Sequence, residues 1–185
     1  NFYLSFSPER LDPGIKKVLI QNIPKITSGI TTQCLQISSK IYQKVYKKVV
    51  KVSSTQAAET TKLLENVYRA VNIGLVNELK ILTDKLNLNI HEIINAASTK
   101  PFGFVPFYPG PGLGGHCIPI DPYYLSWKAE NVGIKTRFIK LAGEINSSIP
   151  KIIVKKIKNI FNKSKKRNYK ILVLGVTYKK NINDL

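Results

Sequence analysis

Residues 54–87 read STQAAETTKLLENVYRAVNIGLVNELKILTDKLN, and they decide the fold of this 185-residue chain. Apolar side chains recur in this stretch at steps of three and four residues, the period of an amphipathic helix. They are Leu64, Val67, Val71, Leu75, Leu79, Leu82 and Leu86. Ser54 or Thr55 is a suitable cap for the start of a helix, and no proline follows before Asn87. The pattern predicts one helix of roughly 30 residues, about 50 Å long.

A helix of this length exceeds the usual helix of a globular domain, so we expect it to cross more than one packing environment. An ordinary amphipathic core helix explains the same periodicity equally well.

Shorter segments precede the long helix. Asn1–Phe6 is expected to be the tail of a strand, and Ser7–Thr27 to be rich in loops because prolines and a glycine interrupt it. Thr31 can cap a helix that runs to about Tyr46. The β-branched run Lys47–Val52 predicts a short strand.

The chain after the long helix is predicted to be mostly helical. Pro150 is expected to kink or restart a helix, and Asp121 to cap one whose first residue is Pro122. The expected elements in chain order are a helix from Asn89 to Ala97, a loop from Ser98 to Pro119, a helix from Asp121 to about Gly133, a helix from Arg137 to Ile149, a helix from Lys151 to Phe161 and a strand from Ile171 to Gly175.

The composition excludes several classes of protein. No apolar run reaches the length of a membrane span, and two cysteines form neither a disulfide framework nor a metal-ligand cluster. We therefore expect a cytoplasmic protein with no metal and no membrane partner. The net charge of +18 would suit nucleic acid, but lysines outnumber arginines and no aromatic pattern accompanies them. We do not expect specific nucleic-acid binding.

The stretch Phe102–Tyr124 reads FGFVPFYPGPGLGGHCIPIDPYY and carries the chemistry. Cys117 follows a run of glycines and prolines whose backbone can approach a ligand closely, and Asp121 follows four residues later. A thiol in this setting is suited to covalent catalysis. A single cysteine is more often a small buried apolar residue, and a loop of this composition is more often only a loop.

Four motifs in the same order resemble the UDP-glucose/GDP-mannose dehydrogenase family. They are Ser7-Pro8-Glu9-Arg10, Lys62-Leu63-Leu64-Glu65-Asn66, Gly114-Gly115-His116-Cys117-Ile118-Pro119-Ile120-Asp121, and the final ILVLGVTYKKNINDL. The resemblance covers nearly the whole chain. Arg10 and Ile120 stand where the UDP-glucose enzymes typically have Phe and Lys, so the chain resembles most the members that oxidise UDP-N-acetylhexosamines, UDP-N-acetylglucosamine in particular.

The resemblance implies a mainly α chain, the central helical dimerisation domain of such an enzyme flanked by partial Rossmann-like α/β pieces. Residues 1–53 would end the NAD-binding domain, 54–150 would form the helical domain with the cysteine loop, and 151–185 would begin the UDP-binding domain. It also implies a homodimer through the long helix 54–87. We expect this middle portion to be inactive by itself.

The resemblance further implies the roles of the site residues. With two NAD⁺, the enzymes turn the C6 alcohol of the UDP-sugar into a carboxylate. Cys117 would form the thiohemiacetal and the thioester, Lys62 and Asn66 would stabilise charge on the C6 oxygen, and Asp121 would handle protons with Lys62. Glu9 would assist hydrolysis, and Cys117 and Glu9 would also lie at the cofactor. The substrate-binding residues would be Tyr108, Pro109, Gly110, Pro111, Gly112, Leu113, Gly114 and Lys179.

Other interpretations remain open. Without the resemblance, Lys62 and Asn66 would read as a solvated polar stripe on a helix, and Glu9 as a turn carboxylate. The run Gly110–Gly115 follows no predicted strand and opens no predicted helix, so we reject it as a dinucleotide-binding turn. We also rank a His116–Cys117 pair low, since neighbours in an extended loop point apart. The UDP-sugar could instead be UDP-glucose or UDP-N-acetylmannosamine. A non-catalytic dimerisation module, a decayed remnant and a basic nucleic-acid binder are the alternative functions.

Overall fold

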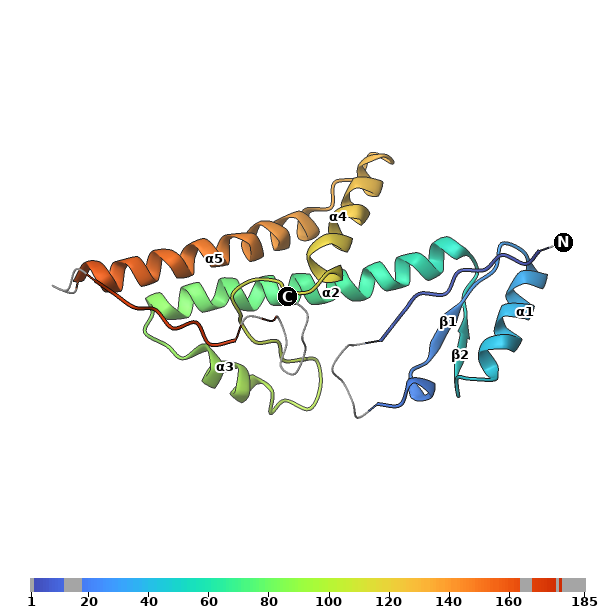
Figure 1. The fold of residues 1–185 in the computed structure, drawn as a ribbon, viewed down its shortest axis with the longest axis horizontal. Helices are drawn as coiled ribbons and strands as arrows, with labels where there is room; N and C mark the ends of the chain where they lie inside the picture. Colours follow the sequence, from blue (N-terminus) through green and yellow to red (C-terminus); the bar gives the residue numbers. More distant parts are fainter. Residues whose placement is uncertain (1, 12–17, 164–167, 176, 178–185) are drawn as a thin grey trace. The chain divides into compact units, whose positions relative to one another are not determined.

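The computed structural model describes residues 2–11, 18–163, 168–175 and 177. The elements in chain order are a 3₁₀ turn η1 (Ile20–Asn22), β1 (Lys25–Thr27), α1 (Thr32–Gln43), β2 (Val49–Lys51), α2 (Thr55–Lys85), α3 (Ile90–Ala97), α4 (Cys117–Glu130) and α5 (Arg137–Lys163). Figure 1 shows this order, and helices dominate the described residues as predicted. Two compact units divide at α2, one up to Glu65 and the other from Asn66 onward.

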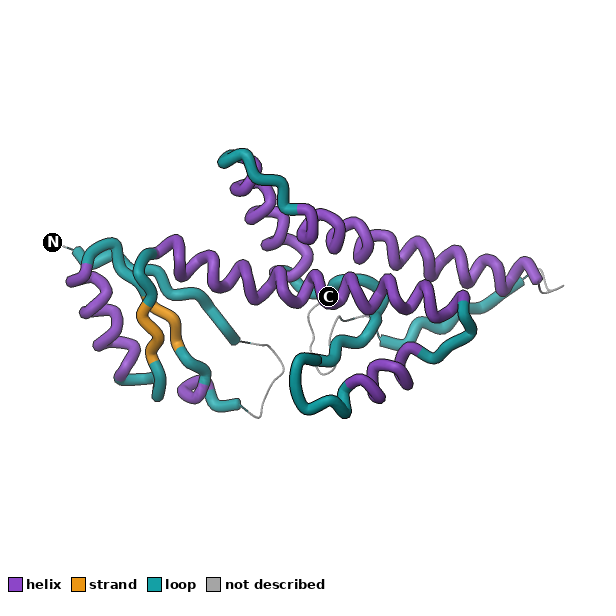
Figure 2. The backbone as a smooth tube through the Cα atoms, turned by 180° about the vertical axis from the view of Figure 1, so that it is seen from behind, coloured by secondary structure: helices purple, strands orange, loops and turns teal. Residues whose placement is uncertain are grey.

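The first unit is a β-α-β piece. Strands β1 and β2 pair in parallel, with Lys25 opposite Val49 and Thr27 opposite Lys51, and α1 is the crossover that parallel strands require. Figure 2 shows the two strands side by side. The Thr31 hydroxyl accepts a hydrogen bond from the Cys34 amide, so the predicted cap is confirmed. The helix ends at Gln43, before the predicted Tyr46.

Two expectations for this unit are wrong. Strand β1 lies inside the segment that we expected to be loops, because a strand of three residues is stabilised by its pairing with β2 and leaves little local pattern. Residues 2–6 are not a strand. Their carbonyls at Leu4 and Phe6 accept from the amides of Ile30 and Ser28, which lie beyond the end of β1.

Helix α2 confirms the predicted long helix to within two residues at each end. The Ser54 hydroxyl accepts from the Ala57 amide and caps the start. At the other end Asn87 has a φ of 55°, and the Leu88 amide donates to the Thr83 carbonyl at 2.9 Å. This left-handed residue with a bond back to the last turn is a common way to end a helix.

The second unit packs α3 and α5 against α2. Ile90 and Ile94 of α3, whose start is capped by Asn89 as predicted, form a core with Val76 of α2 and Phe107. Figures 1 and 2 both show α5 running beside α2. At their crossing Gly74 is buried, and a Cβ there would stand 3.3 Å from the Ala142 Cα. The small residue therefore allows the two helices to approach closely.

An ion pair joins the same two helices further along. Asp84 of α2 accepts from Lys80 of its own helix and, at 3.1 Å, from Lys156 of α5. These two ammonium groups, Lys80 first, lower the pKa of Asp84. Asp84 therefore stays charged in mildly acidic solution.

Three expectations for the second unit are corrected. Pro150 does not break α5. Its ring removes a single hydrogen-bond donor, the one that would pair with the Asn146 carbonyl, and the helix continues on both sides. Helix α4 begins at Cys117 rather than Asp121, because Pro119 lies in the first turn, where amides have no intrahelical acceptor. The segment Ile171–Gly175 is not a strand.

The reason for the last correction is the lack of a partner. Leu172 and Leu174 are 80% and 86% exposed, and no strand pairs with this segment within the described residues. A strand needs a neighbour to accept its backbone hydrogen bonds. Across the described ranges, none of the helices combines the length and the apolar character needed to cross a bilayer.

Candidate active site

Cys117 is the first residue of α4, and its side chain is exposed. The amides of the first turn of a helix have no partner within the helix, and their dipoles favour a negative charge nearby. The preceding turn contains Gly115, whose φ of 81° belongs to the left-handed region. The local sequence therefore presents the thiol at the surface, at the start of helix α4.

Asp121 lies one turn after Cys117 on the same helix, so the two share a face. Its carboxylate accepts a hydrogen bond of 2.5 Å from the side-chain amide of Asn66. Asn66 is completely buried in α2, and Arg69 donates to the other end of its amide. The structure thus brings together two of the predicted site residues that lie 55 positions apart.

Lys62 and Glu9 belong to the first unit. Lys62 lies on α2 one turn before Asn66, and its side chain is half-buried. Glu9 is exposed, and its neighbour Arg10 forms an ion pair of 2.7 Å with Glu65. This ion pair attaches the Ser7–Arg10 motif to the part of α2 that belongs to the first unit.

The predicted substrate-binding loop is held by contacts at two positions, Tyr108 and Gly110. The Tyr108 hydroxyl donates to the Asn95 side chain at 2.8 Å, and its ring stacks on His91. The Gly110 amide donates to the Asn77 side chain at 3.0 Å. Gly112 has a φ of 126°, a conformation that a side chain strongly disfavours. Lys179, the remaining predicted substrate residue, lies outside the described residues.

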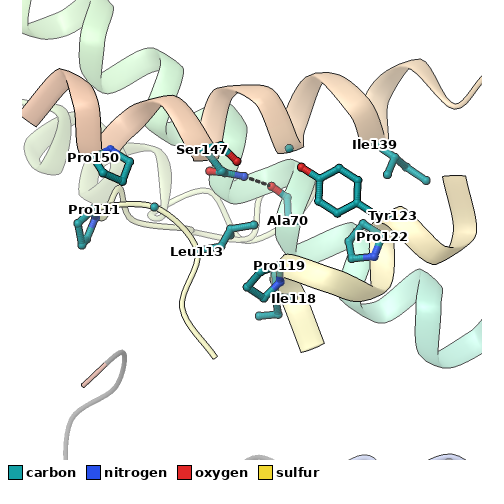
Figure 3. Close-up of a pocket in the computed structure, with 13 residues that line it drawn as sticks. Ala70, Pro111, Leu113, Ile118, Pro119, Pro122, Tyr123, Ile139, Ser147 and Pro150 are labelled. Atoms are coloured by element: carbon teal, nitrogen blue, oxygen red, sulfur yellow. Dashed lines mark hydrogen bonds between the residues drawn. The ribbon is translucent and has the colours of Figure 1, made fainter. Parts of the chain in front are cut away.

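A pocket with a volume of about 170 Å³ opens where this loop meets α4 and α5. Figure 3 shows Leu113, Pro119 and Tyr123 around it. Tyr123 packs against Gly143 of α5, where a Cβ would clash with the phenol. The pocket is smaller than the roughly 300 Å³ of typical ligand sites, and Cys117 does not line it. It therefore has room for only part of a ligand of ordinary size.

The glycine run Gly110–Gly115 does lead into a helix, contrary to the prediction. Helix α4 opens directly after Gly115 and His116. No strand precedes the run between residues 86 and 116, all of which the structure describes. A dinucleotide-binding turn requires both a strand before and a helix after it.

Two buried residues at this site were missed in the sequence. Asn77 and Asn146 are 1% and 2% exposed and hydrogen-bond each other at 2.9 Å. The signal for Asn77 was its position at i+11 from Asn66 on the same face of α2. A polar residue on the buried face of a helix needs a hydrogen-bond partner, so its position there indicates a contact with another part of the chain.

Comparison with known proteins identifies the relatives of this chain. The sequence profile of the UDP-glucose/GDP-mannose dehydrogenase family, central domain, matches residues 56–148. The chain is 38% identical over its full length to a UDP-N-acetyl-D-glucosamine 6-dehydrogenase of Salmonella typhi and 37% identical over 98% of its length to a UDP-N-acetyl-D-mannosamine dehydrogenase of Methanocaldococcus jannaschii. It spans 44% and 41% of these two relatives.

Solved structures agree with the sequence comparison. The UDP-N-acetyl-mannosamine dehydrogenase Cap5O from Staphylococcus aureus is 33% identical, with a TM-score of 0.78, over 98% of this chain and 41% of that one. A UDP-D-ManNAc dehydrogenase from Pyrococcus horikoshii is 31% identical, with a TM-score of 0.79, over 88% of this chain and 38% of that one.

Proposed function

Because this chain belongs to the UDP-glucose/GDP-mannose dehydrogenase family, we propose that the intact protein oxidises the C6 hydroxyl of a UDP-N-acetylhexosamine to a carboxylate. UDP-N-acetylglucosamine is the first choice of substrate, with UDP-N-acetylmannosamine and UDP-glucose as alternatives. The names of the relatives cited above support a UDP-sugar. A cytoplasmic location remains a prediction.

One observation carries the proposal. The exposed Cys117 thiol shares a helix face with Asp121, and the buried amide of Asn66 donates to that carboxylate at 2.5 Å. A nucleophile, a proton-handling group and a neutral hydrogen-bond donor are thereby gathered near the start of α4. This set is what oxidation of an alcohol through a covalent aldehyde adduct requires.

Cys117 is the nucleophile in this proposal. The C6 alcohol first loses a hydride and a proton and becomes an aldehyde. The Cys117 thiolate adds to the aldehyde carbon and forms a thiohemiacetal. Loss of a second hydride gives a thioester, and water cleaves its C–S bond to release the carboxylate and return the thiol. NAD⁺, when bound, supplies the acceptor for both hydrides.

The neighbouring groups stabilise charge and move protons. Lys62 and Asn66, one turn apart on α2, would place an ammonium and an amide donor at the C6 oxygen as it becomes negative. Asp121 would take the proton of the alcohol and, with Lys62, orient the water for hydrolysis. Glu9 would assist that hydrolysis as a base or a water anchor.

The residues described here do not fit the whole cofactor. The pyrophosphate of NAD⁺ needs a glycine-rich turn between a strand and a helix, and no such turn occurs in the described ranges. We therefore assign only Cys117 and Glu9 to the cofactor side of the site, as positions near the nicotinamide. The loop from Tyr108 to Gly114 and Lys179 are assigned to the UDP-sugar.

A homodimer through α2 is part of the proposal. Four leucines at steps of four, three and four residues form an exposed apolar stripe: Leu75, Leu79 and Leu82 on α2, and Leu86 directly after its last residue. Such a stripe is suited to pack against the same stripe of a second copy.

Replacing Leu75 and Leu82 together by lysine is expected to convert the dimer to a monomer, because it buries charges in the apolar interface. Light scattering coupled to size-exclusion chromatography measures the mass. Leu88→Lys, an exposed leucine beyond the end of α2, is the control that should keep the dimer. A dimeric double variant would contradict the proposed interface.

The activity is tested by supplying the intact protein with NAD⁺ and each of the three UDP-sugars. We expect two NADH for every uronate formed, because both oxidations occur before the product leaves. Absorbance at the NADH band and mass spectrometry of the nucleotide sugar give the two amounts. A ratio of one, with aldehyde as the product, or no turnover of any UDP-sugar, would refute the proposal.

A further inference from the structure

Two buried asparagines connect the cysteine loop to the helices beneath it. Asn77 of α2 and Asn146 of α5 lie 69 positions apart and are almost completely buried. The Gly110 amide donates to the Asn77 carbonyl oxygen at 3.0 Å, the Asn77 amide donates to Asn146 at 2.9 Å, and the Asn146 amide donates to the Ala70 carbonyl at 3.0 Å. Figure 3 marks the last bond at Ala70. We call this series the amide relay.

The chemistry of its ends fixes the direction of the relay. A backbone amide only donates, so Asn77 must turn its oxygen to Gly110 and its nitrogen to Asn146. A backbone carbonyl only accepts, so Asn146 must turn its nitrogen to Ala70. Both side chains therefore have one satisfied orientation. A buried network in which every group is paired specifies a single arrangement of the elements that it joins.

A second contact, between Gly112 and the backbone of Asn146, places the loop against α5. Pro150 has no amide proton, so the carbonyl of Asn146 lacks its normal helical donor. Gly112 lies over this carbonyl, and a Cβ at Gly112 would stand 3.2 Å from its oxygen. The loop thus meets the side chain of Asn77 at Gly110 and the backbone of Asn146 at Gly112.

Two residues on one face of α2 hold the chain segments that precede and follow Cys117. Asn66 binds Asp121, which follows the cysteine, and Asn77 binds Gly110, which precedes it. Because Asn66 and Asn77 are rigidly spaced on one helix, the loop and the start of α4 are positioned relative to each other. A ligand contacted by the loop is positioned with them.

We propose that Asn77 and Asn146 are positioning residues that fix the Gly110–Gly114 loop in the conformation that binds the UDP-sugar. The inference rests on the proposed function, and neither asparagine contacts the reacting atoms. Its consequence is that the relay sets the KM for the UDP-sugar, whereas NAD⁺ binding does not depend on it.

The first test substitutes Asn77 by alanine in the intact protein. The Gly110 amide then loses its acceptor, and we expect its hydrogen exchange to accelerate about ten-fold or more. Pro109 and Pro111 carry no amide proton, so Gly110 is the only one of residues 109–111 whose exchange contributes to a peptide that spans the loop. We also expect the KM for the UDP-sugar to rise about ten-fold while the KM for NAD⁺ is unchanged.

The split between the two KM values distinguishes positioning from loss of folded protein. A partly unfolded preparation has fewer active molecules, which lowers kcat and leaves both KM values alone. Asn162→Ala, an exposed asparagine of α5, is the matched control and should change neither exchange nor KM.

A second pair of variants leaves the buried asparagines intact in case Asn77→Ala does not fold. Gly110→Pro removes the first donor of the relay, whereas Gly110→Ala keeps it and meets only a distant atom, 3.9 Å away. Because Gly110 is itself assigned to the sugar-binding loop, the two variants are compared with each other, and we expect the proline variant to raise the KM for the UDP-sugar well above that of the alanine variant. Unchanged exchange at Gly110 in Asn77→Ala, or equal KM values for the two Gly110 variants, overturns the proposal. If the unsubstituted protein turns over no UDP-sugar, the proposed function fails, and exchange at Gly110 still decides whether the relay holds the loop.

Discussion

Replacing Cys117 by alanine is expected to abolish the uronate product of the intact protein, with a fall in kcat of roughly 10⁴-fold or more. The thiol forms the covalent bond in the proposed second oxidation, and no other described nucleophile of its strength is exposed, since Cys34 is buried. The first hydride transfer does not require the sulfur. A small amount of aldehyde is therefore expected in place of uronate.

The second cysteine of the chain provides the matched control. Cys34 is buried at the start of α1, where the Thr31 hydroxyl donates to its sulfur and lowers the pKa of the thiol. Cys34→Ala removes the same atom from the first unit and is expected to leave uronate formation close to that of the unsubstituted protein. Mass spectrometry of the nucleotide sugar measures both variants. Normal uronate formation by Cys117→Ala would exclude the thioester.

Asn66→Ala has the second largest expected effect. Asn66 is the buried donor that we propose for the C6 oxygen, and loss of one such donor costs about 10²–10³-fold in kcat. The substitution also leaves the Asp121 carboxylate without the hydrogen bond of 2.5 Å. We expect kcat to fall by this factor with a much smaller change in the KM for the UDP-sugar, because the donor acts mainly on charge that develops in the transition state.

Asn72→Ala serves as the control on the same helix. Its side chain donates to the Tyr68 carbonyl of α2 itself, at the surface, so its loss should leave kcat alone. Steady-state kinetics with each variant, accompanied by circular dichroism to check the helix content, give the comparison. Equal kcat values for the two variants would show that Asn66 does not stabilise the transition state.

Local signals predicted much of this fold. The periodicity of residues 55–85 and the caps at Thr31 and Asn89 depend on neighbours within one or two turns, and the structure confirms them. The predictions for the segment of β1 and for the start of α4 were wrong. Pairing with β2 decides the first, and a proline tolerated in the first turn, Pro119, allows the second. The segment 171–175 shows the converse, since an apolar run without a partner forms no strand.

The residues of the candidate site also fall into those that the sequence predicted and those that it did not. Cys117, Asp121 and Asn66 were found through motifs, and the hydrogen bond between the last two agrees with their assignment to one site. Asn77 and Asn146 have no motif, and their partnership bridges 69 positions. Only the folded arrangement of α2 and α5 brings such residues together, so sequence spacing alone could not reveal them.

The contrast between the two cysteines has a practical consequence. The chain contains two cysteines. Cys34 is buried, whereas Cys117 is exposed to solvent. A bulky maleimide dye is thereby directed to position 117 of the natural sequence, without any engineered attachment point. Fluorescence from that position would test whether a sugar nucleotide binds near the beginning of α4, as proposed.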